Sequence, residues 1–309
     1  MFLLVTGGAG FIGSHLVRTA LGRGHRVRVL DDLSAGRAER LPEGVELQVG
    51  DVSDGRTAAA AAVGTDAIVH LAARRAVPRS LDAPLDTDRA NTHGSLSVLE
   101  AARHAGAARV VLASSSSVYG ATAAFPTPET TAPLPRSPYA VSKLAGEHYA
   151  RVYQELFGLS TLSLRLFNVY GPGQPADDAY AQLVPRFLAA LGSGAAPVVH
   201  GDGTQSRDLV HVADVVEALL LAAERHEVTG VLNVGSGRSI SVVDLLSLCH
   251  TVSGRSQGPQ PASGPRRIGD VPRTCADTTK ARELLGWSAT TPLEEGLAAT
   301  WSARPSPDL

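Results

Sequence analysis

Tyr139 and Lys143 have the spacing in this chain that most directly suggests acid–base chemistry. They form a Y-x-x-x-K pattern directly after Pro138. Proline favours the first turn of a helix, so we expect the two side chains one turn apart on one helical face. A tyrosine with its ordinary pKa of about 10 is a poor base at neutral pH, and we expect the Lys143 ammonium group to lower that pKa. The alternative is a surface lysine beside a packed tyrosine, although the chain has only one other lysine, Lys280.

A run of four serines, residues 114–117, follows residues 109–113, which we expect to be a strand. Hydroxyl groups at the carboxyl end of a strand lie where doubly wound sheets bind their ligands. The run therefore offers a hydroxyl group that could act beside Tyr139, whereas a plain serine-rich turn is the alternative.

A glycine-rich turn between the first expected strand and the first expected helix predicts a nucleotide site. Gly7, Gly10 and Gly13 form a G-x-x-G-x-x-G pattern. Successive glycines in such a turn permit a tight bend, close approach of a pyrophosphate and close packing of helix on strand. The free N–H groups of the helix N-terminus would face the phosphates. The alternative is a glycine turn without a ligand.

Acidic residues stand where a dinucleotide site would need them. Asp31 ends the second expected strand, 18 residues after Gly13. This is near the spacing of about 20 residues at which an acid holds the ribose hydroxyls of NAD. Because a carboxylate repels a 2′-phosphate, the acid favours NAD over NADP. Asp32 is a neighbouring candidate, with an ordinary solvated acid as its alternative.

Short apolar segments alternate with helical patterns through the first half of the chain. The segments cover residues 2–5, 27–30, 45–49, 67–71 and 110–113. Such alternation is typical of βαβ units, so we predict an α/β fold of the Rossmann type, with a doubly wound and mostly parallel sheet. Leu162, Leu164 and Leu166 alternate with polar residues, which predicts a half-buried strand.

The later chain is interrupted by segments rich in Pro, Gly and Ser, at residues 126–138, 171–175 and 253–265. We therefore predict an NAD-binding domain over residues 1–166 and a smaller C-terminal α/β cap over residues 167–309 that binds the substrate. A strand near residues 231–234 would return to the first sheet, so the two domains are expected to be interleaved.

Composition excludes several classes of protein. The chain has 309 residues, 44% of them hydrophobic and 19% charged, with a formal net charge of −2. This favours a folded core and gives no polybasic face for nucleic acid or an anionic membrane. Two cysteines are too few for a disulfide framework, no metal-ligand spacing is found, and no apolar run approaches the ~20 residues that span a bilayer. With no signal peptide at its start, the chain is expected to be cytoplasmic.

Taken together, these residues resemble the NAD-dependent nucleotide-sugar epimerase/dehydratase family of the extended short-chain dehydrogenases/reductases, and UDP-sugar 4-epimerases above all. The resemblance runs from Leu4 to about Trp287. Besides the motifs above, it includes residues 50–52 (GDV), 70–73 (HLAA), 76–80 (AVPRS), 166–172 (LFNVYGP), 201–208 (GDGTQSRD), 233–237 (NVGSG) and 267–270 (RIGD).

The resemblance implies a role for individual residues. Ser115, Tyr139 and Lys143 would be catalytic, with Tyr139 as the base and Lys143 holding the nicotinamide ribose. The residues assigned to NAD are Gly7, Gly10, Phe11, Ile12, Gly13, Asp31, Asp32, Asp51, Val52, Leu71, Ala72, Ala73, Arg75, Asn91, Tyr139, Lys143 and Phe167. Those assigned to the nucleotide-sugar substrate are Ser115, Asn168, Leu183, Val199, Arg207, Arg267 and Asp270. Paired guanidinium donors suit a diphosphate, which supports Arg207 and Arg267 on physical grounds.

The implied reaction is 4-epimerisation through a 4-keto sugar, in which hydride passes to NAD and returns to the other face. Similar dehydratases have an acidic pair after the catalytic hydroxyl residue, and similar decarboxylases have a glutamate there. Here Ser116, Ser117 and Val118 follow Ser115, so epimerisation is preferred. The alternatives are a UDP-glucuronate 4-epimerase or decarboxylase, a nucleotide-sugar dehydratase, a dehydrogenase with exchangeable NADP, and a non-catalytic NAD-binding regulatory protein.

Two finer expectations also come from the resemblance. Thr274 aligns with a position where epimerases restricted to glucose and galactose have a bulky tyrosine. A small residue leaves room for an N-acetyl group, so we expect UDP-GlcNAc and UDP-Glc as substrates. The helices expected near residues 87–104 and 139–157 are similar to a pair that forms a dimer interface in the family, which implies a homodimer.

Overall fold

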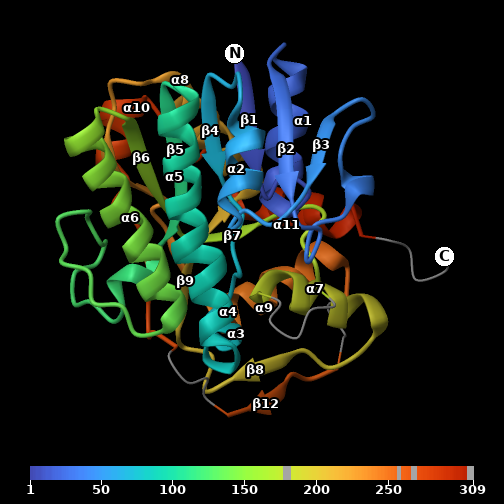
Figure 1. Cartoon of the computed structure of the whole chain (residues 1–309). Helices are drawn as coiled ribbons and strands as arrows, with labels where there is room; N and C mark the ends of the chain where they lie inside the picture. The colour runs from blue at the N-terminus through green and yellow to red at the C-terminus, as the bar shows by residue number, and fades with distance from the viewer. Residues whose placement is uncertain (177–181, 256–258, 266–269, 305–309) are drawn as a thin grey trace.

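The main layer of the molecule is a seven-stranded sheet in which all neighbouring strands are parallel, in the order β10-β6-β5-β4-β1-β2-β3 (Figure 1). The computed structural model describes residues 1–176, 182–255, 259–265 and 270–304. The strands are β1 (Phe2–Thr6), β2 (Arg26–Asp31), β3 (Glu46–Val49), β4 (Ala67–His70), β5 (Arg109–Ser115), β6 (Ser160–Leu166) and β10 (Gly230–Val234). The predicted doubly wound parallel sheet is confirmed.

Helices cover both faces of this sheet, as the alternation of buried residues along the strands requires. Leu3 and Val5 face one helical layer, whereas Leu4 between them faces the other. The first layer contains α1 (Phe11–Gly22), α8 (Val212–Glu224) and α10 (Thr279–Leu285). The second contains α2 (Gly55–Ala62), α5 (Gly94–Ala105) and α6 (Pro138–Phe157).

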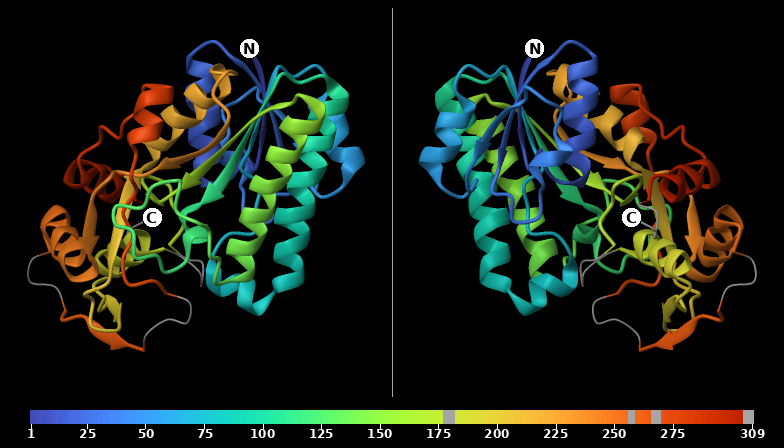
Figure 2. Two further views of the ribbon diagram at one scale, coloured as in Figure 1. Left: turned by 90° about the vertical axis from the view of Figure 1, so that its left-hand side faces the viewer. Right: turned by 90° about the vertical axis from the view of Figure 1, so that its right-hand side faces the viewer.

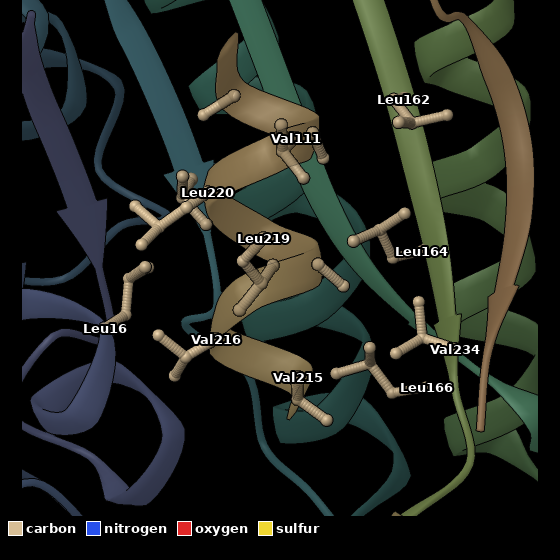
Figure 3. Packing of buried hydrophobic residues seen from close by; sticks show 14 of the residues in the cluster. Leu16, Val111, Leu162, Leu164, Leu166, Val215, Val216, Leu219, Leu220 and Val234 are labelled. Carbon is tan, nitrogen blue, oxygen red and sulfur yellow. The ribbon is translucent and has the colours of Figure 1, made fainter. Parts of the chain in front are cut away.

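Helix α8 and strand β10 come late in the sequence, but their buried residues belong to the hydrophobic core between the main sheet and the first helical layer. Figure 3 shows Leu219 and Leu220 of α8 pointing at the sheet, where Leu164 and Val234 lie on neighbouring strands. After residue 167 the chain therefore returns to the main sheet as the helix α8 and the strand β10, and again as the helix α10.

The predicted half-buried strand at residues 162–166 is wrong. Its polar residues Ser163 and Arg165 are only 1% and 4% exposed, because α6 covers the face of β6 opposite the leucines. The polar side chains of this strand therefore need partners inside the protein.

A second, smaller unit lies beyond the carboxyl ends of the main strands (Figures 1 and 2). Its sheet has the order β11-β9-β7, and a separate pair joins β8 to β12. The strands are β7 (Asn168–Tyr170), β8 (Val198–His200), β9 (Ser206–His211), β11 (Ser239–Ser241) and β12 (Ala262–Gly264). The helices α7 (Leu183–Ser193), α9 (Val242–Ser253) and α11 (Leu293–Ser302) enclose its core.

Short elements connect these layers near the carboxyl ends of the strands. They are η1 (Ala38–Arg40), α3 (Val77–Asp82), α4 (Pro84–Asp88), η2 (Arg89–His93) and η3 (Ser116–Tyr119). Across the described residues, each helix is too short or too polar to cross a bilayer.

Candidate active site

A cleft of ≈ 470 Å³ separates the carboxyl ends of the main strands from the second unit. Its volume lies in the range of sites that bind small molecules, about 300–1,000 Å³. Twenty of the residues assigned from sequence line it: Gly7, Gly10, Phe11, Ile12, Gly13, Asp31, Asp32, Asp51, Val52, Leu71, Ala72, Ala73, Arg75, Ser115, Tyr139, Lys143, Phe167, Asn168, Arg207 and Asp270. Residues that are far apart in the sequence are thus brought to one surface.

Three other assigned residues lie off the cleft. Asn91 is buried and bonds to the backbone of Arg74. Leu183 begins α7 and packs on the core of the second unit, and Val199 is buried in that core. Arg267 falls outside the described residues.

Several cleft residues escaped the sequence reasoning. Arg74, Arg79, Arg136 and Gln174 all line the cleft. Arg74 directly precedes the assigned Arg75, so its place after a strand could have identified it. Arg136 lies in the proline-rich segment that reads as a surface loop, and its return to the cleft has no local signal.

The glycine turn has the shape that a pyrophosphate needs. Gly7 has a φ of 70°, and a Cβ added there would lie 2.6 Å from the backbone nitrogen of Ala72. A Cβ at Gly13 would collide with the carbonyl oxygen of Gly7. The N-cap of α1 is Gly10, which lacks a side chain that could cap the helix, so the first N–H groups remain available to an anion.

The two acids after β2 have different surroundings. Asp31 is buried, which raises its pKa, and its two carboxylate oxygens each accept one backbone N–H at 2.9 Å, from Ala9 and Leu33. Each oxygen has a further lone pair for a ribose hydroxyl. Asp32 instead accepts the N–H and hydroxyl of Ser34 and pairs with Arg74 at 3.2 Å. Asp31 and the glycine turn together fit the adenosine diphosphate half of NAD.

The serine run ends β5 and turns Ser115 into the cleft. Its hydroxyl oxygen caps η3, where it accepts the N–H of Ser117 at 3.2 Å and bonds the Ser117 hydroxyl at 2.9 Å. Ser114 points the other way and donates to Glu147 at 2.5 Å. The strand thus fixes one serine in the site and uses its neighbour to anchor α6.

Tyr139 and Lys143 occupy the first turns of α6, whose N-cap Ser137 accepts the N–H of Ala140 and whose first residue is Pro138. The Lys143 nitrogen lies 6.0 Å from the centre of the Tyr139 ring and donates to the carbonyl of Ala113 at 2.8 Å. The predicted helix opening is therefore observed.

The prediction that the pKa of Tyr139 is lowered by the protein's own side chains is wrong. Burial raises the pKa of Tyr139, and a hydrogen bond with Ser115 and the charge of Arg75 only partly oppose this shift. Burial also lowers the pKa of Lys143 to about 8. Desolvation dominates both shifts because both side chains are enclosed.

The second unit supplies the far wall of the cleft. Arg207 on β9 pairs with Asp270 and donates to the carbonyl of Ser206 at 2.7 Å. A guanidinium group has five N–H donors, so Arg207 retains donors for a ligand anion. Thr274 accepts the N–H of Asp208 at 3.1 Å through its hydroxyl and faces the cleft.

Comparisons with known proteins agree with this arrangement. Residues 3–235 match the model of the NAD dependent epimerase/dehydratase family. The chain is 41% identical to a UDP-glucose 4-epimerase of Mycolicibacterium smegmatis, with 97% of each chain covered.

Solved structures extend the comparison. A UDP-glucose 4-epimerase of Thermotoga maritima, crystallised with UDP-glucose, has a TM-score of 0.94 at 37% identity, with 98% of each chain covered. A UDP-N-acetylglucosamine 4-epimerase of Methanobrevibacter ruminantium, in complex with UDP-N-acetylmuramic acid, has a TM-score of 0.93 at 33% identity, with 97% of each chain covered. The chain belongs to the NAD-dependent epimerase/dehydratase family.

Proposed function

We propose that this protein is a UDP-sugar 4-epimerase that acts on UDP-GlcNAc and UDP-Glc. The observation that carries the proposal is the convergence of Ser115, Tyr139 and Lys143 in one cleft. The glycine turn and Asp31 form one end of that cleft, and Arg207 lies on the wall formed by the second unit. The relatives named as UDP-sugar 4-epimerases support the same reaction.

The chain's own residues divide the acid–base work. NAD, when bound, would supply the acceptor and the donor of hydride at C4 of the sugar. Tyr139 accepts the proton of the 4-hydroxyl and later gives it back, so one side chain serves both directions. Ser115 hydrogen-bonds the same oxygen, and the charge of Arg75 partly opposes the effect of burial on the pKa of Tyr139. Lys143 would hold the nicotinamide ribose. Arg207 would hold the substrate diphosphate while the 4-keto sugar turns over.

The segment after Ser115 favours epimerisation over loss of water. Elimination needs a group that can protonate a leaving hydroxyl and another that removes a carbon-bound proton. Ser116, Ser117 and Val118 occupy η3, where Val118 is buried and the Ser117 hydroxyl is bonded to Ser115. These residues supply neither group, so the 4-keto sugar would be reduced again.

The size of Thr274 sets the range of sugars. Its side chain faces the cleft, and its hydroxyl is fixed on the backbone of Asp208. Asp208 is fully buried, and its carboxylate also accepts the backbone N–H groups of Ser236, Gly237 and Ala276. The backbone around Thr274 is thereby held rigidly, so a larger residue there would reduce the space for an N-acetyl group.

We expect Thr274→Tyr to abolish most activity on UDP-GlcNAc while activity on UDP-Glc remains within a few-fold of wild type. A clash with one extra group in a pocket changes kcat/KM by roughly 10- to 200-fold. The measurement is kcat/KM for UDP-Glc, UDP-GlcNAc and UDP-glucuronate in wild type and variant, with Thr274→Ser as the matched control. A wild type that strongly prefers UDP-Glc over both other sugars would contradict the argument from Thr274.

We also infer a homodimer formed by α5 and α6. Helix α6 exposes three large apolar side chains, Val141 at 52%, Leu156 at 71% and Phe157 at 50%. Light scattering should give twice the mass of one chain at micromolar concentration. Leu156→Glu should shift the mass toward one chain, whereas Val63→Glu, an exposed valine at the end of α2, should not. A wild type with the mass of a single chain would refute the inference.

A further inference from the structure

Arg74 reaches across the cleft at the end where the glycine turn lies. It follows β4 by four residues, and its side chain contacts the loop after β2. The order of strands in the sheet is β4-β1-β2, so the carboxyl end of β1 and its glycine turn lie between the two anchoring points. The side chain therefore passes over the place where the pyrophosphate and adenosine of NAD would lie.

The guanidinium group of Arg74 has polar partners on two separate elements. Its Nη2 lies 3.2 Å from the carboxylate of Asp32, and its Nη1 donates to the hydroxyl of Ser34. Its Nε donates to the carboxylate of Asp86 on α4 at 3.2 Å. One cation thus joins the loop after β2 to α4.

The backbone of Arg74 is held independently of its side chain. Its N–H donates to the side-chain oxygen of Asn91 at 2.7 Å, and its carbonyl accepts from the Asn91 amide at 3.1 Å. The same amide donates to Ser142 at 3.0 Å, and Ser142 donates to the carbonyl of Tyr139 at 2.8 Å. Asn91 therefore fixes the base of the Arg74 side chain to the helix that carries the catalytic tyrosine.

The two carboxylates differ in their relation to the cleft. Asp32 lines it, whereas Asp86 lies outside it on α4. A change at Asp86 can therefore loosen the Arg74 side chain without removing a group from the NAD site. A substitution of Asp86 therefore distinguishes two roles of Arg74: a strap over the cofactor and a direct contact with the cofactor.

We propose that Arg74 is a strap that closes the cleft over the adenosine half of NAD and slows its release. The strap is a positioning residue, held by Asp32 and Ser34 on one side and by Asp86 on the other. This proposal rests on the assignment of the cleft to NAD, and it accounts for an arginine side chain with three polar anchors that line or flank the cleft. Retention of NAD between turnovers suits a reaction that regenerates NAD in each cycle.

The test measures how fast NAD leaves the full-length protein. Wild type, Arg74→Met and Asp86→Asn are loaded with NAD, and release is followed after dilution into an enzyme that consumes free NAD. We expect release roughly 2- to 5-fold faster in Asp86→Asn, which loses one partly exposed ion pair, and roughly 10-fold faster in Arg74→Met, which loses all the side-chain anchors at once. The double variant should release NAD no faster than the faster single variant, because both changes act on one strap.

The matched control is Arg23→Met, which removes an arginine paired with Glu217 on the surface, and it should leave the release rate unchanged. Thermal unfolding of each variant shows that it folds. Unchanged release in Arg74→Met overturns the strap. Faster release in Arg74→Met with wild-type release in Asp86→Asn also overturns it, because Arg74 would then act by direct contact. A wild type that binds no NAD at all overturns the cofactor assignment itself.

Discussion

Replacing Tyr139 with phenylalanine is expected to lower kcat for 4-epimerisation by about 10²- to 10⁴-fold, the range for loss of a positioned acid–base group. The change removes one oxygen atom from the cleft and leaves the ring packed on α6. We therefore expect KM and the amount of NAD bound per chain to stay within a few-fold of wild type. Tyr149→Phe removes the equivalent hydroxyl from a tyrosine farther along α6 that lies outside the cleft, and it should retain full activity.

The pH dependence of the same reaction tests the roles of the two groups. The phenolate is the basic form, and burial raises the pKa of Tyr139, so kcat/KM should rise as the pH increases from the acid side. Burial lowers the pKa of Lys143 to about 8, so the ammonium group that would hold the nicotinamide ribose is lost above that pH, and the rise should end above about pH 8. The rising limb should be absent in Tyr139→Phe. A variant that keeps both near-normal kcat and the rising limb would refute the assignment of Tyr139 as the base.

The parts of the site that could be predicted from sequence are those in which a short segment determines its own geometry. Tyr139 and Lys143 are one helical turn apart wherever α6 lies, and Pro138 identifies the start of that helix. The positive φ of Gly7 and the close approach of Gly13 to the Gly7 carbonyl are set by backbone sterics within the turn after β1 itself. For these residues, spacing along the chain was enough.

The parts that could not be predicted depend on partners far away in the sequence. Asn91 was assigned to NAD, yet its side chain joins Arg74 to Ser142, which lie 17 and 51 residues away. The pKa of Tyr139 depends on how completely the surrounding chain excludes water, and a pairwise rule about Lys143 does not contain that information. The polar face of β6 looked solvent-exposed because its partner lies on another element.

That partner is Glu147, which lies one helical turn beyond Lys143 on α6. Its carboxylate accepts from the Arg165 guanidinium at 2.9 and 2.7 Å and from the Ser114 hydroxyl at 2.5 Å. The side chains of Glu147 and Arg165 are each only 5% exposed. The Arg165 guanidinium also lies 4.6 Å from the centre of the Tyr119 ring. One buried ion pair therefore joins β5, β6 and α6.

Glu147→Ala is expected to lower the free energy of unfolding by about 3–5 kcal/mol, because it leaves the Arg165 charge buried without its carboxylate. Urea unfolding at a fixed NAD concentration measures the change, since bound NAD also stabilises the fold. The matched control is Glu155→Ala on the same helix, which breaks an exposed pair with Arg151 at 2.8 Å and should cost less than about 1 kcal/mol.

The double variant Glu147→Leu with Arg165→Met distinguishes the cost in stability of an unpaired buried charge from the cost of lost packing. Apolar residues of similar volume remove both charges at once, so most of the stability should return, as it does when buried pairs are replaced together. Its kcat should still be below that of wild type, because Ser114 and α6 would no longer share an anchor beside Ser115 and Lys143. A cost below about 1 kcal/mol for Glu147→Ala would show that Arg165 finds other partners and that the ion pair does not hold α6 in place.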